Sequence, residues 1–125
     1  MSGLGRDERD VALLAASKGG SSTRQIRLTD YIGNGKLAST PYLVKVDENR
    51  FLMLWEEFDY QGDSTAAIDR GVCYVEMDAS GEVLGKTQSL PSASLSNDCR
   101  PILIDGGVTW YINTMVGRMF YQISV

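Results

Sequence analysis

Four carboxylates that stand close together, Glu56, Glu57, Asp59 and Asp63, are the side chains best suited to chemistry. Two carboxylic acids at a suitable separation can hydrolyse a glycosidic bond without a histidine, one as general acid and the other as base or nucleophile. Neighbouring residues of a β-strand point to opposite faces, so Glu56 and Glu57 cannot form such a pair, whereas Glu57 and Asp59 could share a face. We favour the alternative, a solvated strand end that runs into a long loop over residues 58–70, and we assign no catalytic residue. That loop is where a binding surface would be grafted.

Other catalytic and redox chemistry has little support. The sequence has no histidine, which removes the commonest general base and a common metal ligand. The two cysteines, Cys73 and Cys99, could form a disulfide or remain as thiols. We favour free thiols, because Cys73 lies within an apolar strand pattern and two cysteines are too few for a disulfide scaffold.

Two acidic turns, residues 59–63 and 78–82, could offer oxygen ligands to calcium. Neither follows the spaced acids of an EF-hand loop, so we interpret both as plain turns. The glycine pairs at 19–20 and 106–107 have no helix after them, which leaves no support for phosphate binding. We therefore predict no metal site and no cofactor.

Aromatic side chains could form a platform on which a sugar ring stacks. At alternating strand positions, however, such residues more often pack in the core or between sheets, and we favour that interpretation. The residues concerned are Trp55, Trp110, Tyr111, Phe120 and Tyr121.

The composition indicates one globular unit. A chain of 125 residues with 43% hydrophobic and 22% charged residues can build one core. A net charge of −4 argues against nucleic acid as a partner. The uninterrupted apolar runs, such as residues 51–55, are far too short for membrane insertion. Residues 1–6 lead into charged residues rather than an apolar stretch, so no signal peptide is visible, although this means little if the chain is an excerpt.

An internal repeat of about 60 residues is the strongest feature of the sequence. Residues 10–20 align with residues 71–81, and residues 40–44 align with residues 100–104. After small gaps, residues 51–55 correspond to residues 108–112. In the first of these alignments the apolar positions and the turn glycine coincide, and residues 71–77 are echoed once more by residues 117–123.

The repeat unit reads as four short strands joined by tight turns, at residues 41–46, 50–57, 72–78 and 82–90. Four antiparallel strands joined by hairpins are typical of a β-propeller blade. We therefore predict an all-β fold of propeller-like blades, with about two blade-equivalents in an open or partial propeller.

The chain would contain a tail (1–10), the last hairpin of one blade with its link (11–40), a full blade (41–90), and a link with a partial blade (91–125). On this division the chain starts and ends inside a blade. If copies closed a ring by exchanging strands, the N-terminal segment would supply one extra copy of the third strand of the unit. Residues 7–16 are also a good helix by propensity before the glycines at 19–20. We favour a strand there, because the alignment with residues 71–81 carries tertiary information that local propensity lacks.

With its Pro-x-Leu-Val/Ile strands and the aromatic-rich strand that ends in Trp55-Glu56-Glu57, the chain resembles the propeller repeats of large bacterial surface or secreted proteins. It lacks the dipeptides of WD repeats, and its Gly106-Gly107 pair is misplaced for kelch repeats. The resemblance implies an extracellular or cell-surface binding or scaffolding role with no defined chemistry.

We therefore expect a non-enzymatic blade segment whose partners are other blades or copies of itself, and which could bind a protein or glycan ligand. The alternative is part of a carbohydrate-active, glycoside-processing propeller whose acids lie partly outside this chain.

Overall fold

The computed structural model describes residues 7–16, 19–62 and 65–125, and these residues form antiparallel β-sheets with no helix. The all-β prediction is confirmed, and with no helix in those ranges there is none that could cross a membrane. The strands of the described ranges are β1 (Ala12–Ala16), β2 (Thr23–Arg27), β3 (Lys36–Ala38), β4 (Tyr42–Asp47), β5 (Arg50–Tyr60), β6 (Ala67–Asp78), β7 (Gln88–Leu90), β8 (Ile102–Ile104), β9 (Gly107–Thr114) and β10 (Gly117–Ser124).

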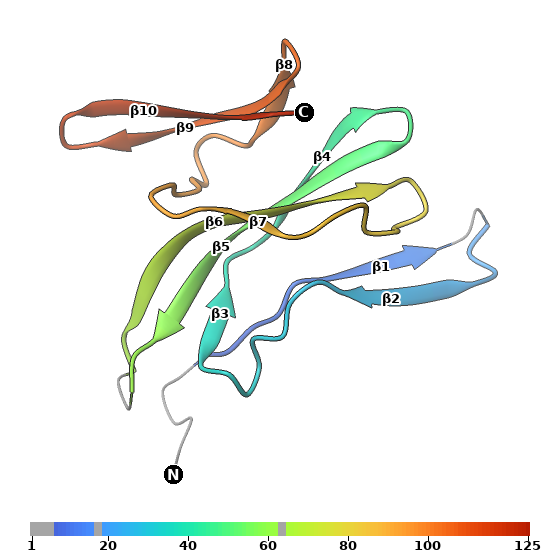
Figure 1. Ribbon diagram of the computed structural model, residues 1–125, viewed down its shortest axis with the longest axis horizontal. Helices are drawn as coiled ribbons and strands as arrows, with labels where there is room; N and C mark the ends of the chain where they lie inside the picture. The colour runs from blue at the N-terminus through green and yellow to red at the C-terminus, as the bar shows by residue number, and fades with distance from the viewer. Residues whose placement is uncertain (1–6, 17–18, 63–64) are drawn as a thin grey trace.

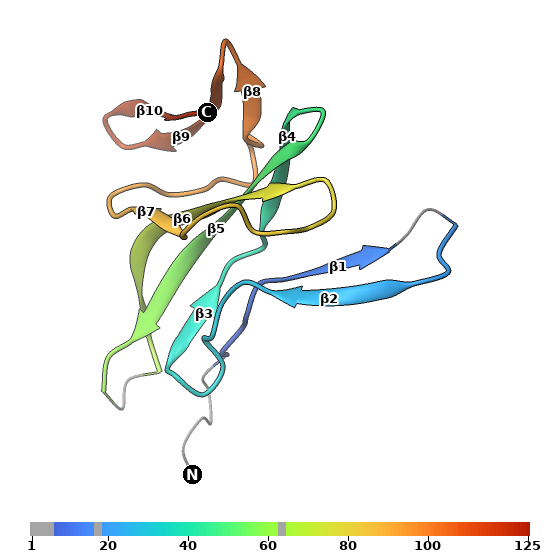
Figure 2. The same cartoon turned by 45° about the vertical axis from the view of Figure 1, so that its right-hand side comes forward.

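The described strands form three sheets that lie one over another (Figure 1). The middle sheet contains β3 to β7, with β3 and β4 sharing the same edge of β5. The β1–β2 hairpin lies on one side of it and the β8–β10 sheet on the other, as a view turned by 45° also shows (Figure 2). The middle sheet is therefore covered on both faces.

Two apolar clusters hold the three sheets together. Cluster 1 joins the β1–β2 hairpin to the middle sheet through residues such as Val11, Trp55 and Met77. Cluster 2 joins the middle sheet to the β8–β10 sheet and includes Leu54 and Trp110. Strand alternation explains the division, because successive side chains of β5 and β6 point to opposite faces and both faces are apolar.

The N-terminal segment forms strand β1, not a helix, as the repeat predicts. Its burial alternates with a period of two, with Val11, Leu13 and Ala15 directed toward the middle sheet and Leu14 exposed. A helix would spread these apolar residues around its axis and leave cluster 1 without part of its cover. Tertiary packing thus overrides the helix propensity of this segment.

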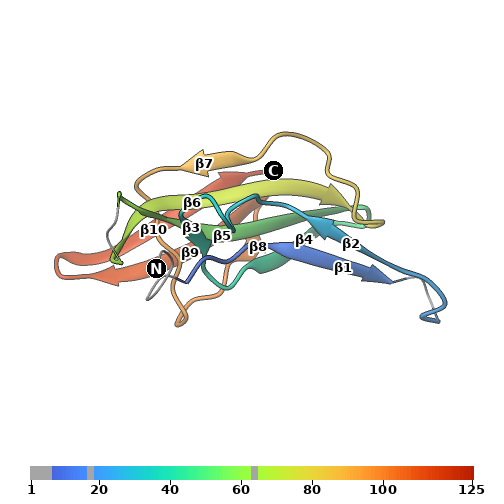
Figure 3. The ribbon, with the colours of Figure 1, turned by 90° about the horizontal axis from the view of Figure 1, so that it is seen from below.

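The prediction of a long loop over residues 58–70 is wrong. β5 continues to Tyr60 and β6 starts at Ala67, so the two strands form one long hairpin. The link before residue 39 also contains a strand that the sequence did not indicate. This strand, β3, pairs with β5 and places Leu37 opposite Phe58. The middle sheet consequently has five strands rather than the predicted four. Figure 3 shows β4, β5, β6 and β7 side by side across this sheet.

The fourth predicted strand, residues 82–90, is mostly irregular. Within it the structure has β7 and a single bridge between Met77 and Val83. The segment lies at the sheet edge and carries Gly85 and Lys86, which offer little apolar surface to bury. Edge strands are often short for this reason.

Two turns depend on glycine. The β8–β9 hairpin turns at Asp105 and Gly106, with φ values of 48° and 79°, as in the Asp-Gly turn that two-residue hairpins prefer. At Gly71, φ is 106°, next to a bulge in the β5–β6 pairing. A Cβ atom at Gly71 would lie 2.3 Å from the carbonyl oxygen of Leu90, so the backbone of β6 passes close to the end of β7.

Candidate functional site

Strand β5 separates the carboxylates that were the best candidates for chemistry. Glu56 points toward cluster 2, and its backbone neighbour Glu57 points toward cluster 1, as strand alternation predicts. Asp59 lies two residues further on and pairs with Arg70, whose Nε atom is 3.5 Å from Asp59 Oδ2. Asp63 lies outside the described residues. Among the described acids, Glu56 and Glu57 therefore lie on opposite faces of the sheet, and Asp59 has Arg70 as its partner.

Glu57 is held in a network of polar side chains at the edge of cluster 1. Its Oε1 atom accepts a hydrogen bond from the Tyr31 hydroxyl at 2.5 Å and a weaker one from the Cys73 thiol at 3.7 Å. The Tyr31 oxygen in turn accepts a hydrogen bond from Trp55 Nε1 at 3.0 Å. Lys36 Nζ lies 3.7 Å from the other oxygen, Glu57 Oε2. The carboxylate is thus neutralised and hydrogen-bonded within the fold.

The Tyr31 hydroxyl and the Cys73 thiol both stay protonated in this network. Burial, together with the hydrogen bond to Glu57, raises the pKa of Tyr31 far above its usual range. Burial and the neighbouring Glu57 charge raise the pKa of Cys73 to about 11, so this thiol stays protonated and unreactive near neutral pH. Cys73 is buried and Cys99 half-buried, and both are free, as predicted. We infer that the network serves the structure.

Glu56 is a buried carboxyl that ties the link after β7 to the middle sheet. It is 8% exposed, and its Oε1 atom accepts a hydrogen bond from the backbone N–H of Leu95 at 2.9 Å. Burial and then a hydrogen bond with Asp69 raise the pKa of Glu56 to about 7. Such a value suits a general acid or base. Here, however, the link over residues 91–99 uses the carboxyl as its anchor.

Replacing Glu56 with glutamine is expected to stabilise the protein at pH 8 and to have little effect at pH 4. In the folded protein Glu56 keeps its proton up to about pH 7, whereas in the unfolded chain it loses the proton near pH 4.5. Its contribution is therefore complete below pH 4.5 and is lost as the pH rises to 7. Glutamine imitates the neutral acid, so the difference in free energy of unfolding should grow by about 1–3 kcal/mol over this range.

Urea unfolding at closely spaced pH values measures this difference. Glu48→Gln is the matched control, because the Glu48 side chain is 99% exposed and its replacement should change stability little. A Glu56→Gln difference that does not change between pH 4 and pH 8 would show that Glu56 ionises normally in the folded protein.

Among the residues that the structure describes, no group of three or more His, Cys, Asp or Glu side chains could hold a metal ion, and the first acidic turn includes Asp63, which lies outside those residues. Asp78 Oδ1 accepts hydrogen bonds from the backbone N–H groups of Ser80 and Glu82, both at 2.9 Å. The hydrogen bond from the Ser80 hydroxyl and those from the backbone lower the pKa of Asp78. This carboxylate therefore organises its own turn, which is the plain-turn interpretation.

The predicted aromatic residues divide between core and surface. Trp55 and Trp110 are fully buried, and Tyr121 packs on Trp110 with ring centroids 5.3 Å apart. Tyr111 and Phe120 lie on the outer side of the β8–β10 sheet, with centroids 5.6 Å apart. Packing thus explains the tryptophans, whereas Phe120 is exposed and Tyr111 and Tyr121 are half-buried.

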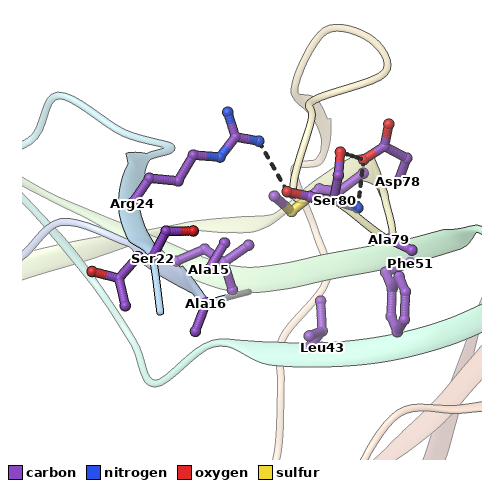
Figure 4. A pocket seen from close by; sticks show the side chains of 13 residues that line it. Ala15, Ala16, Ser22, Arg24, Leu43, Phe51, Asp78, Ala79 and Ser80 are labelled. Atoms are coloured by element: carbon purple, nitrogen blue, oxygen red, sulfur yellow. Dashed lines mark hydrogen bonds between the residues drawn. The ribbon is translucent and has the colours of Figure 1, made fainter. Parts of the chain in front are cut away.

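A groove of about 610 Å³ opens between the β1–β2 hairpin and the end of the middle sheet. Leu43, Phe51 and Met77 supply apolar walls from the middle sheet. On the rim, Arg24 Nη2 donates a hydrogen bond to the carbonyl oxygen of Ser80 at 2.9 Å, as Figure 4 shows. The groove can accept an apolar group whose polar end lies near the Arg24 guanidinium.

A smaller groove of about 220 Å³ lies at the corresponding place between the middle sheet and the β8–β10 sheet. Tyr74 and Glu76 line it where the repeat puts Leu13 and Ala15 in the first groove. The smaller side chains of β1 explain why the first groove is wider. Each junction between sheets therefore forms the same kind of hollow.

Several residues around Glu56 and Glu57 could not be identified from the sequence. Tyr31 and Leu95 lie in segments that read as links, far from β5 in the sequence. Asp69 lies in the predicted loop. A tyrosine within a polar link was the one available signal, because a buried tyrosine hydroxyl usually requires a hydrogen-bond partner.

Comparisons with protein-family models, with curated proteins and with solved structures gave no match to this chain.

Proposed function

We propose that this chain is a non-enzymatic segment of a β-propeller-like stack that serves binding or scaffolding, with further sheets of the same kind as partners. The observation that carries the proposal is the direction in which equivalent side chains of the repeat point. We call a side chain backward-facing when it points to the preceding sheet in the chain and forward-facing when it points to the following one. Residues at equivalent positions of the repeat face the same way in successive sheets. Blades of a propeller pack on one another in this repeated manner.

The third strand of the unit has three copies that obey this rule. Just before β1, Val11 faces forward to the middle sheet, and its equivalent in β6, Val72, faces forward to the β8–β10 sheet. In β6, Val75 and Met77 face back into cluster 1. Their equivalents in β10 are Tyr121 and Ile123, which face back into cluster 2. The agreement supports a common blade-like unit.

The second strand of the unit has two copies that obey the same rule. In β5, Met53 faces back into cluster 1 and Leu54 faces forward into cluster 2. In β9, the equivalent of Met53 is Trp110, which faces back into cluster 2. The equivalent of Leu54 is Tyr111, on the outer side of the last sheet. The forward-facing positions of the β8–β10 sheet are therefore not covered by any described strand.

The contacts of the carboxylates favour binding over catalysis. Glu56 and Glu57 are each bound to groups of the protein, so neither is free to act on a substrate without breaking its network. The groove beside Arg24 offers a place for a ligand at a junction between sheets. Hydrolysis of a glycan panel by the parent chain, lost in Glu57→Gln, would overturn the non-enzymatic part of the proposal.

The stack itself is tested by lengthening it. Ala79 and Val125 are equivalent in the repeat, so a copy of residues 80–125 added after Val125 continues the repeat in register. The added segment supplies an edge strand for β10 and a sheet whose backward face covers Tyr111 and Phe120. We expect a higher urea midpoint than for the parent chain in a single cooperative transition, because stacked repeats stabilise their neighbours.

A Gly-Ser extension of equal length is the control for chain length and should leave the urea midpoint of the parent unchanged. Hydrogen exchange at β9 and β10 should slow only in the chain with the added repeat. A second, separate transition with no gain in midpoint would overturn the proposal, because the added sheet would then fold without docking.

A further inference from the structure

The outer side of the β8–β10 sheet is an apolar surface that the described part of the chain does not cover. It consists of Ile102, Ile104, Tyr111 and Phe120, which we name the tail face. Ile102, Ile104 and Phe120 are 51%, 43% and 65% exposed. Tyr111 lies beneath the guanidinium of Arg118, whose Cζ atom is 4.9 Å from the ring centroid. Exposed apolar side chains that share one face of a sheet are the kind of surface used for interaction.

The middle sheet shows how an equivalent face is covered. The repeat equates Ile104 with Val44, Tyr111 with Leu54, and Phe120 with Tyr74. Those equivalents belong to cluster 2, where the backward face of the next sheet packs on them. The chemistry of the tail face therefore suits the backward face of another sheet built from this repeat.

The chain carries one backward face that no described strand covers, on the outer side of the β1–β2 hairpin. It consists of Ala12, Leu14 and Ala16, which we name the head face. All three are exposed, and Leu14 is 69% exposed. In the repeat they are equivalent to Cys73, Val75 and Met77, whose backward orientation closes cluster 1. A single leucine between two alanines is complementary in size to the bulky side chains of the tail face.

We propose that the head face of a second copy of this chain docks on the tail face, so that copies associate head to tail. This inference rests on the proposed stacking of equivalent sheets and names its partner. The two faces are different surfaces of one molecule, so the contact is heterologous and leaves one head face and one tail face free. Association therefore extends into rings or open stacks rather than ending at a symmetric dimer.

Both faces also carry polar side chains. On the side of the head face, β2 contributes Thr23, Gln25 and Arg27, which are the cross-strand partners of Ala16, Leu14 and Ala12. On the tail face, Gln122 lies next to Thr109, with 3.4 Å between Nε2 and Oγ1. A two-stranded hairpin offers a small contact, so we expect weak association that requires a high protein concentration.

Mixed cross-linking tests the orientation of the contact. In a Cys99→Ser background, one preparation carries Leu14→Cys and a second carries Phe120→Cys, and a short bismaleimide is added to each and to their mixture. The mixture should give cross-linked dimers, and each preparation alone should give at most traces. Dimers formed by Phe120→Cys alone would reveal a symmetric tail-to-tail contact and overturn the proposal.

Solution mass tests the contact without cross-linking. The weight-average mass of the parent chain should rise with concentration, and Phe120→Asp should return it to the monomer mass. Met115→Asp is the matched control, because Met115 is fully exposed at the β9–β10 turn and outside the tail face. Its mass should rise as the parent's does. A parent chain that stays monomeric at millimolar concentration overturns the inference. The chain lengthened by a copy of residues 80–125 distinguishes the two proposals. If its urea midpoint rises while the parent chain stays monomeric, the stacking proposal stands and the proposal of self-association fails.

Discussion

Replacing Trp55 with alanine is expected to lower the free energy of unfolding by about 3–5 kcal/mol, the usual cost of emptying a buried aromatic site. Trp55 is fully buried in cluster 1, and its Nε1 atom donates a hydrogen bond to the Tyr31 hydroxyl. The alanine variant therefore loses apolar contact and leaves the Tyr31–Glu57 pair with one partner fewer. A loss of this size is a large part of the stability of a small domain.

The damage should be local to one junction. Cluster 1 joins the β1–β2 hairpin to the middle sheet, so amide hydrogen exchange in β1 and β2 should accelerate far more than in β9. Trp110→Ala provides the mirror image, because Trp110 is buried in cluster 2 and should loosen the β8–β10 sheet instead. Phe120→Ala, at an exposed aromatic residue, should cost less than about 1 kcal/mol. Equal exchange of both outer sheets in Trp55→Ala would mean that the two junctions are not independent.

Replacing Gly71 with alanine is expected to cost about 2–4 kcal/mol, from two separate effects. The φ value of 106° at Gly71 is one that residues with a Cβ atom rarely adopt. The new methyl group would also lie 2.3 Å from the Leu90 carbonyl oxygen and 2.7 Å from Pro91 Cα, both backbone atoms that cannot rotate away. Strand β7 must shift, and the link after it, which Glu56 anchors through Leu95, must shift with it.

Gly33→Ala separates the two effects. Gly33 has a φ of 88° and no atom within 4 Å of a built Cβ, so its variant bears the backbone cost of about 1 kcal/mol alone. Urea unfolding of both variants gives the remainder as the cost of the close approach of β6 and β7. Equal losses at Gly71 and Gly33 would show that β7 moves aside freely.

Strand identity was predictable wherever the repeat or strict alternation fixed it. The alignment of residues 10–20 with residues 71–81 predicts β1 correctly against its helix propensity, because both copies must bury one face on a neighbouring sheet. The same alternation that separates Glu56 from Glu57 is what places them in different clusters. Period-two patterning thus predicts which face a residue occupies as well as the type of element.

Strand ends were not predictable, for physical reasons that differ between sites. The continuation of the β5–β6 hairpin to Tyr60 depends on Tyr60 packing near the N-terminal segment, where its hydroxyl accepts a hydrogen bond from the Asp7 N–H at 2.8 Å. Conversely, Glu82 and its neighbours have strand-like spacing but lie at the edge of the middle sheet. There a regular strand would gain backbone hydrogen bonds on one side alone. Both outcomes depend on contacts distant in sequence.

The polar networks were also beyond prediction from local pattern. Tyr31 reaches Glu57 only because β3 runs along β5 and turns the preceding segment toward cluster 1. The Leu95 N–H reaches Glu56 only because the link folds back over the middle sheet. An isolated acid in a strand looks solvated when its partners come from links with no periodic signal.

The placement of cluster 1 has a consequence for synthesis of the chain on the ribosome. Leu13 and Met77 contribute to one cluster, although more than sixty residues separate them. At about 5–20 residues per second, the hairpin that contains Leu13 is made roughly 3–13 s before the strand on which it packs. Until β5 and β6 have both been made, cluster 1 is incomplete, and a two-stranded hairpin is barely stable by itself. The β1–β2 hairpin is therefore expected to become ordered well after it has been synthesised.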